Sequence, residues 1–129
     1  MILVDTSVWI EHFRRSSRID LDAVLDLDEV VTCLPVVQEV LQGFDDHGAY
    51  TLARGAMLAF PIVESPLSDG VYLLAVDLYR SARRAGLTVR SSVDCLIGAC
   101  ALRNSLTVLH LDRDFDALAR ISPLEVRRL

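Results

Sequence analysis

Acidic side chains stand at several points of this chain where an apolar run ends or a helix is expected to begin. Asp5 follows the apolar residues 1–4, and Asp94 lies in an apolar stretch. The full set of four is Asp5, Glu39, Asp94 and Asp112, with Asp114 two residues beyond the last. Parallel strands end at a common edge of a sheet, so acids far apart in sequence can share one pocket there. Such a cluster is unfavourable without a cation, and its oxygen-rich, nitrogen-poor donors suit Mg²⁺ or Mn²⁺.

Each acid alone also has an ordinary structural explanation. Asp5 could cap a helix, and Asp94 lies in an expected first helical turn, where the macrodipole favours an acid. Glu39 lies on an expected helix, where most glutamates face solvent. The combination favours a metal site, because a buried acid such as Asp94 needs a partner. The hydroxyls of Thr6 and Ser7 follow Asp5 directly and could orient a carboxylate, a water or a phosphate.

The elements that must position these acids alternate short apolar strands with longer helical patterns. This alternation predicts an α/β fold with a central, mainly parallel sheet flanked by helices. The expected strands are 1–4, 30–34, 60–63, 106–111 and 124–126. The expected helices are 6–13, 35–42, 49–59, 68–84, 93–103 and 115–119, and 19–27 is a further amphipathic segment. The length of 129 residues suits a single domain over residues 1–129.

The charged residues give two opposing indications about nucleic acid. The net charge of -5 argues against unspecific binding to a polyanion. All 13 basic residues, however, are arginines, whose planar guanidinium matches phosphate. Arg14, Arg15 and Arg90 are the candidates for contact with RNA phosphates. For Arg90 the alternative is an ion pair that fixes the loop before Asp94.

The cysteines, histidines and apolar runs indicate neither a zinc site nor a membrane segment. The 3 cysteines fit no disulfide or metal spacing, and we expect them to be buried. We expect the histidines to be structural or solvated; they are His12, His47 and His110. No apolar run reaches the roughly 18 residues of a membrane span, and no signal peptide is visible. The cytoplasm is therefore the expected location.

Four segments together resemble the PIN-domain ribonucleases of the VapC toxin type. The segments are 4–10 (VDTSVWI), 37–43 (VQEVLQG), 92–99 (SVDCLIGA) and 111–116 (LDRDFD). They run in the order and at the spacing of the short bacterial members, and the resemblance covers residues 1 to about 118. Position 98 departs slightly, with glycine where the family more often has alanine, and we expect no effect on the chemistry. The family varies in whether the acid at 112 or at 114 binds metal.

The resemblance implies a Mg²⁺- or Mn²⁺-dependent endoribonuclease that belongs to a type II toxin–antitoxin system. The catalytic and metal-binding acids would be Asp5, Glu39, Asp94 and Asp112, with Asp114 as a further candidate ligand. In-line attack of a metal-activated water would hydrolyse the RNA phosphodiester bond. The partners implied are RNA, a VapB-type antitoxin that lies across apolar helices, and a second copy of the chain or a toxin–antitoxin hetero-oligomer, with no membrane. The helix 68–84, with Tyr72 and Tyr79, could supply part of an interface between copies.

Other functions of a domain with acids at its strand ends fit the sequence less well. A receiver-like phosphoryl-transfer domain needs a lysine near its aspartate, and this chain contains none. A haloacid-dehalogenase-type phosphatase needs a second aspartate two residues after the first, where Ser7 stands. A non-catalytic PIN-like binding module would have lost its metal ligands, whereas all four acidic positions are filled here.

Overall fold

The structure is a computed structural model that describes residues 1–14 and 19–129. Within these residues, one sheet has five strands: β1 (Ile2–Val4), β2 (Val30–Cys33), β3 (Ile62–Val63), β4 (Thr107–His110) and β5 (Val126–Arg128). The strands lie in the order β3-β2-β1-β4-β5, and every neighbouring pair is parallel. The predicted α/β fold with a mainly parallel sheet is therefore confirmed, and the described strands are parallel throughout.

The central strand β1 explains why the first residues of the chain are apolar without alternation. Leu3 pairs with Val31 of β2 on one side and with Val108 of β4 on the other. All three residues are buried. A parallel strand covered on both faces needs apolar side chains at successive positions, and Leu3 and Val4 meet this requirement.

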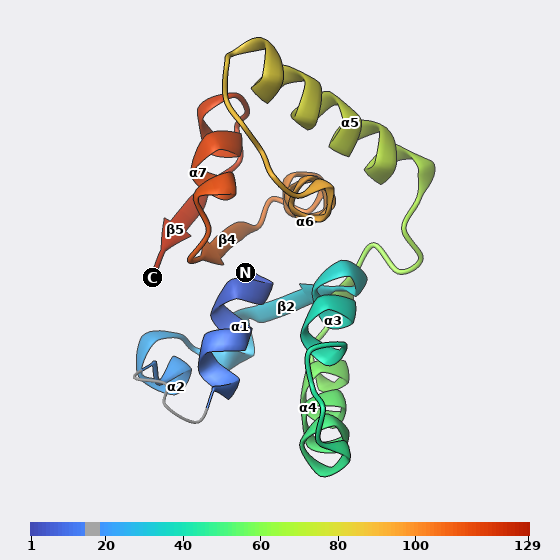
Figure 1. The fold of residues 1–129 in the computed structure, drawn as a ribbon, viewed down its shortest axis with the longest axis vertical. Helices are drawn as coiled ribbons and strands as arrows, with labels where there is room; N and C mark the ends of the chain where they lie inside the picture. The colour runs from blue at the N-terminus through green and yellow to red at the C-terminus, as the bar shows by residue number, and fades with distance from the viewer. Residues whose placement is uncertain (15–18) are drawn as a thin grey trace.

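Helices cover both faces of the sheet (Figure 1). On one side lie α1 (Thr6–Phe13), α2 (Leu21–Val24), α3 (Leu34–Leu41) and α4 (His47–Ala59). On the other lie α5 (Asp69–Arg84), α6 (Ser92–Arg103) and α7 (Arg113–Arg120). α6 contacts α5, α7, α3 and β4, which accounts for its apolar sequence on nearly all sides. None of the described helices has the length and apolar character needed to cross a membrane.

Most expected elements are present, and the clearest difference lies in the segment 19–27. The sequence pattern predicts one amphipathic segment there, whereas the structure has the short helix α2 and a 3-10 helix at Leu27–Glu29. Asp20 and Asp26 each accept the backbone N–H two residues ahead, at 3.1 and 3.0 Å. Two capping aspartates six positions apart therefore start two short helices, and Leu25 between them is extended and buried.

Helix ends also differ by a few residues from expectation. α7 begins at Arg113, before the expected 115, because Asp112 caps it by accepting the N–H of Asp114. α5 ends at Arg84, as expected, and Gly86 follows with a φ of 75°, a conformation that favours glycine after a helix.

Candidate metal centre

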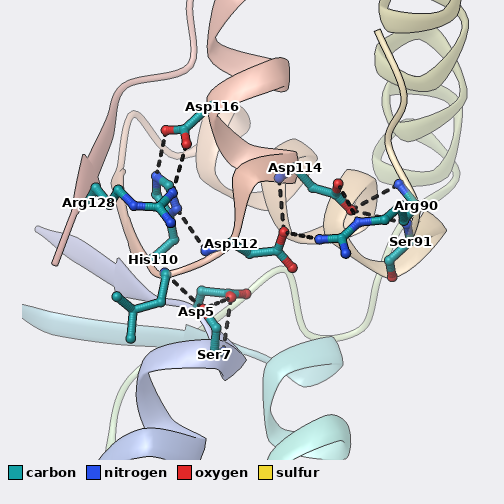
Figure 2. Close-up of polar contacts among 10 residues, drawn as sticks. Asp5, Ser7, Arg90, Ser91, His110, Asp112, Asp114, Asp116 and Arg128 are labelled. Atoms are coloured by element: carbon teal, nitrogen blue, oxygen red, sulfur yellow. Dashed lines mark hydrogen bonds and ion pairs between the residues drawn. The ribbon is translucent and has the colours of Figure 1, made fainter.

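The acids converge where the two strands at the middle of the sheet end. β1 and β4 are neighbours, and the strand order reverses its direction between them. Asp5 is the first residue after β1, and Asp112 is the second residue after β4. Ligands of open parallel sheets bind at such a reversal, beyond the carboxyl ends of the strands. Figure 2 shows Asp5, Asp112 and Asp114 at this edge.

Three of the carboxylates form a tight group. Asp94, Asp112 and Asp114 each offer an oxygen, and these oxygens all lie within 4.8 Å of one another. Asp94 and Asp114 are buried, with exposed fractions of 6% and 1%, and Asp112 is half-buried. α6 brings Asp94 to this place in its first turn, and α7 brings Asp114. Of the acids that the sequence indicates, the structure therefore brings these three together.

Two of the acids do cap helices, but each uses only one oxygen to do so. Asp5 Oδ2 accepts hydrogen bonds from the Ser7 backbone N–H at 3.0 Å and from the Ser7 hydroxyl at 2.6 Å. Asp112 Oδ1 accepts the N–H of Asp114 at 2.9 Å. Capping explains why aspartate is favoured at the start of α1 and α7. Capping does not use the second carboxylate oxygen of either side chain.

Two carboxylate oxygens of this region are buried without a hydrogen-bond partner. Among the described residues, Asp5 Oδ1 and Asp94 Oδ2 are the carboxylate oxygens in this condition. A buried anionic oxygen is costly unless something positive contacts it. Their chemistry, oxygen donors beside further carboxylates, fits a hard divalent cation such as Mg²⁺ or Mn²⁺.

Burial and mutual repulsion shift the titration of these acids. Burial raises the pKa of Asp94 to about 9, with further increases from the adjoining Asp114 and from the charges of Asp5 and Asp112. Burial also raises the pKa of Asp5, against the opposing effect of its hydrogen bonds from Ser7. A divalent cation among them would reverse this shift, because it favours the ionised form.

Asp114 makes contacts that set it apart from the other acids. Its Oδ2 accepts the backbone N–H of Arg90 at 3.0 Å and that of Ser91 at 3.2 Å. Its Oδ1 faces Arg90 Nε at 3.4 Å. Asp114 therefore ties α7 to the loop that leads into α6, and so helps to place Asp94.

Glu39 reaches the same region from α3 through Thr6. The Thr6 hydroxyl donates a hydrogen bond to Glu39 Oε1 at 2.8 Å. Glu39 is half-buried and lies close enough to Asp5 for its charge to raise the pKa of that side chain. It is not part of the tight group of Asp94, Asp112 and Asp114. Thr6 and Ser7 therefore contact the carboxylates of Glu39 and Asp5.

The candidate arginines have different surroundings. Arg90 Nη2 lies 3.0 Å from Asp112 Oδ1, so the expected alternative, an ion pair before Asp94, is present, although its partners are Asp112 and Asp114. Arg14 is exposed and pairs with Glu11 at 3.4 Å. Arg15 lies outside the described residues.

Sequence reasoning missed a polar chain behind Asp112 (Figure 2). His110 is fully buried, and its Nδ1 accepts the backbone N–H of Asp112 at 3.2 Å. Its Nε2 lies 3.3 Å from Asp116 Oδ1, and Arg128 Nη1 donates to Asp116 Oδ2 at 2.9 Å. His110 is structural, as expected, but it supports a site residue. Its position two residues before Asp112, at the end of a buried strand, is the signal that could have indicated this.

Comparisons with known proteins agree on one family. The sequence profile of the PIN domain matches residues 2–121. Ribonuclease VapC11 of Mycobacterium tuberculosis is 38% identical over 131 residues, which cover 97% of this chain and 96% of that protein. The crystal structure of VapBC2 from Rickettsia felis bound to a promoter DNA fragment superposes with a TM-score of 0.79 at 15% identity, over 100% and 99% of the two chains. A toxin–antitoxin complex of M. tuberculosis, VapBC-5, has a TM-score of 0.75 at 22% identity, over 98% and 97%.

Proposed function

This chain belongs to the PIN domain family, and from this premise we propose that it is a Mg²⁺- or Mn²⁺-dependent endoribonuclease. We propose further that it is the toxin of a VapBC-type toxin–antitoxin pair. A relative that is 38% identical is named a ribonuclease, and its whole length is nearly covered. Family membership also agrees with the four sequence motifs that carry the acids.

The observation that carries the metal dependence is the pair of unpartnered buried oxygens, Asp5 Oδ1 and Asp94 Oδ2. Three acids of the region, Asp94, Asp112 and Asp114, offer oxygens within 4.8 Å of one another. A protein that used these acids only as helix caps would have no need to bury two of their oxygens unpaired. A divalent cation would satisfy both.

The contacts of each acid support a division of roles. Asp5, Asp94 and Asp112 would hold the ion, since each keeps an oxygen that no cap occupies. Asp114 Oδ2 accepts two backbone N–H groups of the loop before α6, which supports a positioning role for Asp114 and favours Asp112 as the ligand. Glu39, whose Oε1 accepts a hydrogen bond from Thr6, would contact the ion through a bound water and add a further negative charge to the site.

The chemistry divides between the ion and the chain. A divalent ion bound here supplies a water of lowered pKa and stabilises the charge that builds on the phosphate oxygens. Ser7 keeps Asp5 in one orientation, and Asp114 keeps the loop before Asp94 in place, so the acids need little rearrangement during the reaction. Arg90, at the rim, and Arg14 would contact RNA phosphates, which position the substrate without reading its sequence.

Two surfaces with apolar residues are candidate contact sites for protein partners. A hollow of about 350 Å³ between α1 and α3, lined in part by Phe13, Val40 and Phe44, is where we propose that the antitoxin binds. On α5, Tyr72 and Val76 are 50% and 52% exposed, which supports contact with a second copy. We therefore propose that the chain forms a homodimer, or a hetero-oligomer with its antitoxin.

The test is cleavage of total cellular RNA by the purified chain with Mn²⁺, with Mg²⁺ and with EDTA. We expect cleavage with either ion, none in EDTA, and none by Asp94→Asn, whose fold is checked by urea unfolding. Asp77→Asn, which removes an exposed acid of α5, is the matched control and should cleave normally. Full cleavage by Asp94→Asn, or in EDTA, would overturn a metal-dependent reaction at these acids. Absence of cleavage with either ion would leave a non-catalytic binding module as the better description.

A further inference from the structure

We propose that Arg90 is a displaceable counter-cation of the acid cluster, which a bound divalent ion releases to contact RNA phosphate. In the metal-free chain its guanidinium neutralises Asp112 and Asp114. The inference rests on the proposed function, because it requires a divalent-ion site at these acids. It adds that the chain carries its own competitor for that site.

The guanidinium contacts the acids that surround the candidate ion site. Arg90 Nη2 lies 3.0 Å from Asp112 Oδ1, and Arg90 Nε lies 3.4 Å from Asp114 Oδ1. Figure 2 shows the side chain reaching these two carboxylates. A positive group here and a divalent ion at Asp94 and Asp112 raise each other's energy, since like charges a few ångströms apart repel. The two cations therefore compete.

The side chain and the backbone of Arg90 are held separately. Its backbone N–H and that of Ser91 donate to Asp114 Oδ2 at 3.0 and 3.2 Å. Asp114 is buried, so these two bonds anchor the loop whether or not the guanidinium stays. The side chain can therefore leave by rotation about its own bonds, without any movement of the loop that carries Asp94.

The side-chain contacts are weak enough to be exchanged. The Arg90 side chain is 53% exposed, and its Nε contact is long at 3.4 Å. The Arg90–Asp112 pair is exposed, and exposed ion pairs contribute little to stability, because water screens them and the side chain loses freedom. A divalent ion would contact several carboxylates, and two of their buried oxygens have no partner among the described residues. Its binding therefore stabilises the site by more than the loss of the Arg90 contacts destabilises it.

The released guanidinium remains at the rim of the site. Its backbone is fixed beside Asp114, so its reach still covers the space in front of Asp112. Five donors in a planar fork match a phosphate group better than one edge of a carboxylate. Arg128, the other arginine of Figure 2, is already paired with Asp116 at 2.9 Å. Arg90 is therefore the residue that metal binding makes available to the substrate backbone.

Isothermal titration of Mn²⁺ into the wild-type chain and Arg90→Gln, without RNA, tests the competition. We expect Arg90→Gln to bind Mn²⁺ three- to ten-fold more tightly than the wild type. Arg103→Gln is the matched control, since Arg103 makes a comparable exposed pair with Glu64 at 2.8 Å, and its Mn²⁺ affinity should be unchanged. Equal or weaker binding by Arg90→Gln would overturn the inference and identify Arg90 as a support of the ligands. If the wild type itself binds no Mn²⁺, the proposed function fails with it.

Titration of inorganic phosphate into the same three proteins, loaded with Mg²⁺ or in EDTA, tests the release. The wild type should bind phosphate with Mg²⁺ at least three-fold more tightly than Arg90→Gln does, and Arg103→Gln should match the wild type. In EDTA this difference should disappear, because the guanidinium then stays on the carboxylates. Equal phosphate affinity of the Mg²⁺-loaded wild type and Arg90→Gln would overturn the transfer to phosphate.

Discussion

Ser7 and Leu111 are joined by a hydrogen bond of 3.0 Å, in which the Ser7 hydroxyl accepts the backbone N–H of a residue 104 positions away. The same hydroxyl donates to Asp5 Oδ2 at 2.6 Å. One small side chain thus fixes the carboxylate after β1 and the backbone after β4. These are the two strand ends on which the candidate metal centre is built.

Replacement of Ser7 is expected to loosen both strand ends at once. Ser7→Ala leaves the N–H of Leu111 without its acceptor and removes the hydroxyl that donates to Asp5 Oδ2. We expect a loss of about 1–2 kcal/mol in the free energy of unfolding. We also expect Mn²⁺ affinity to fall roughly 10-fold, as for other residues that orient a metal ligand. Urea unfolding in EDTA and Mn²⁺ titration measure the two effects. Ser7→Thr keeps the hydroxyl and should bind Mn²⁺ nearly normally, whereas native affinity in Ser7→Ala would contradict the role.

The titration of Asp94 predicts how the metal-free chain responds to pH. In the folded chain its pKa is raised to about 9 from an ordinary value of 3.8. Between these values the folded state holds a proton that the unfolded state has lost, so stability falls as pH rises. In EDTA, the free energy of unfolding of the native chain should therefore fall from pH 5 to pH 8.5. The fall should be about 4–5 kcal/mol larger than in Asp94→Asn, which cannot titrate there, because a proton bound only in the folded state contributes about 1.4 kcal/mol per pH unit.

Asp77→Asn supplies the control for that comparison. Its acid is exposed on α5, so the variant should keep the native dependence on pH. Urea unfolding at several pH values gives the slopes. Parallel slopes for the native chain and Asp94→Asn would show that Asp94 ionises normally in the fold.

Metal binding should release the proton of Asp94 into solution. At pH 7 the metal-free Asp94 carries a proton, since its pKa is raised to about 9, and a bound ion must displace it. We expect about one proton released per Mn²⁺ at pH 7, measured from titration heats in buffers of different ionisation enthalpy. The release should diminish above pH 9. Binding without proton release at pH 7 would place the ion away from Asp94.

The site residues that the sequence could predict are those whose immediate neighbours form a recognisable pattern. An apolar run followed by an acid indicates Asp5 and Asp112, because a buried parallel strand ends there and a helix begins. An acid inside an apolar first turn indicates Asp94. The same patterns located the central strands and most helices, since burial on both faces of a sheet leaves a continuous apolar run.

The parts that sequence could not predict depend on contacts between distant segments. Asp114 anchors the loop of Arg90 and Ser91, 24 and 23 positions away, and nothing in a local pattern encodes that pairing. Arg128 reaches Asp116 only because β5 lies beside β4. The segment 19–27 differs for another reason: its apolar pattern indicates one amphipathic segment, whereas two capping aspartates start two short helices there.

Loss of the His110 acceptor is expected to weaken the support of Asp112. His110→Phe fills a similar space but cannot accept the N–H of Asp112, which lies 3.2 Å away. We expect a loss of about 2 kcal/mol in the free energy of unfolding and a clear drop in Mn²⁺ affinity. His110→Asn retains an acceptor and should recover part of the Mn²⁺ affinity. If the two variants bind Mn²⁺ equally, the hydrogen bond does not position Asp112.

An exposed apolar face on α5 predicts where two copies of the chain meet. Tyr72, Leu73 and Val76 are between 50% and 65% exposed, and a charge placed among them would have to be buried in an interface. Val76→Asp is therefore expected to convert a dimer of the purified chain into a monomer, measured by size-exclusion chromatography with light scattering. Its free energy of unfolding as a monomer should change by less than about 0.5 kcal/mol, because the site is exposed. Leu52→Asp, on α4 at 78% exposure, is the matched control and should remain dimeric. A dimer that persists in Val76→Asp, or a monomeric native chain, would exclude this face as the contact between copies.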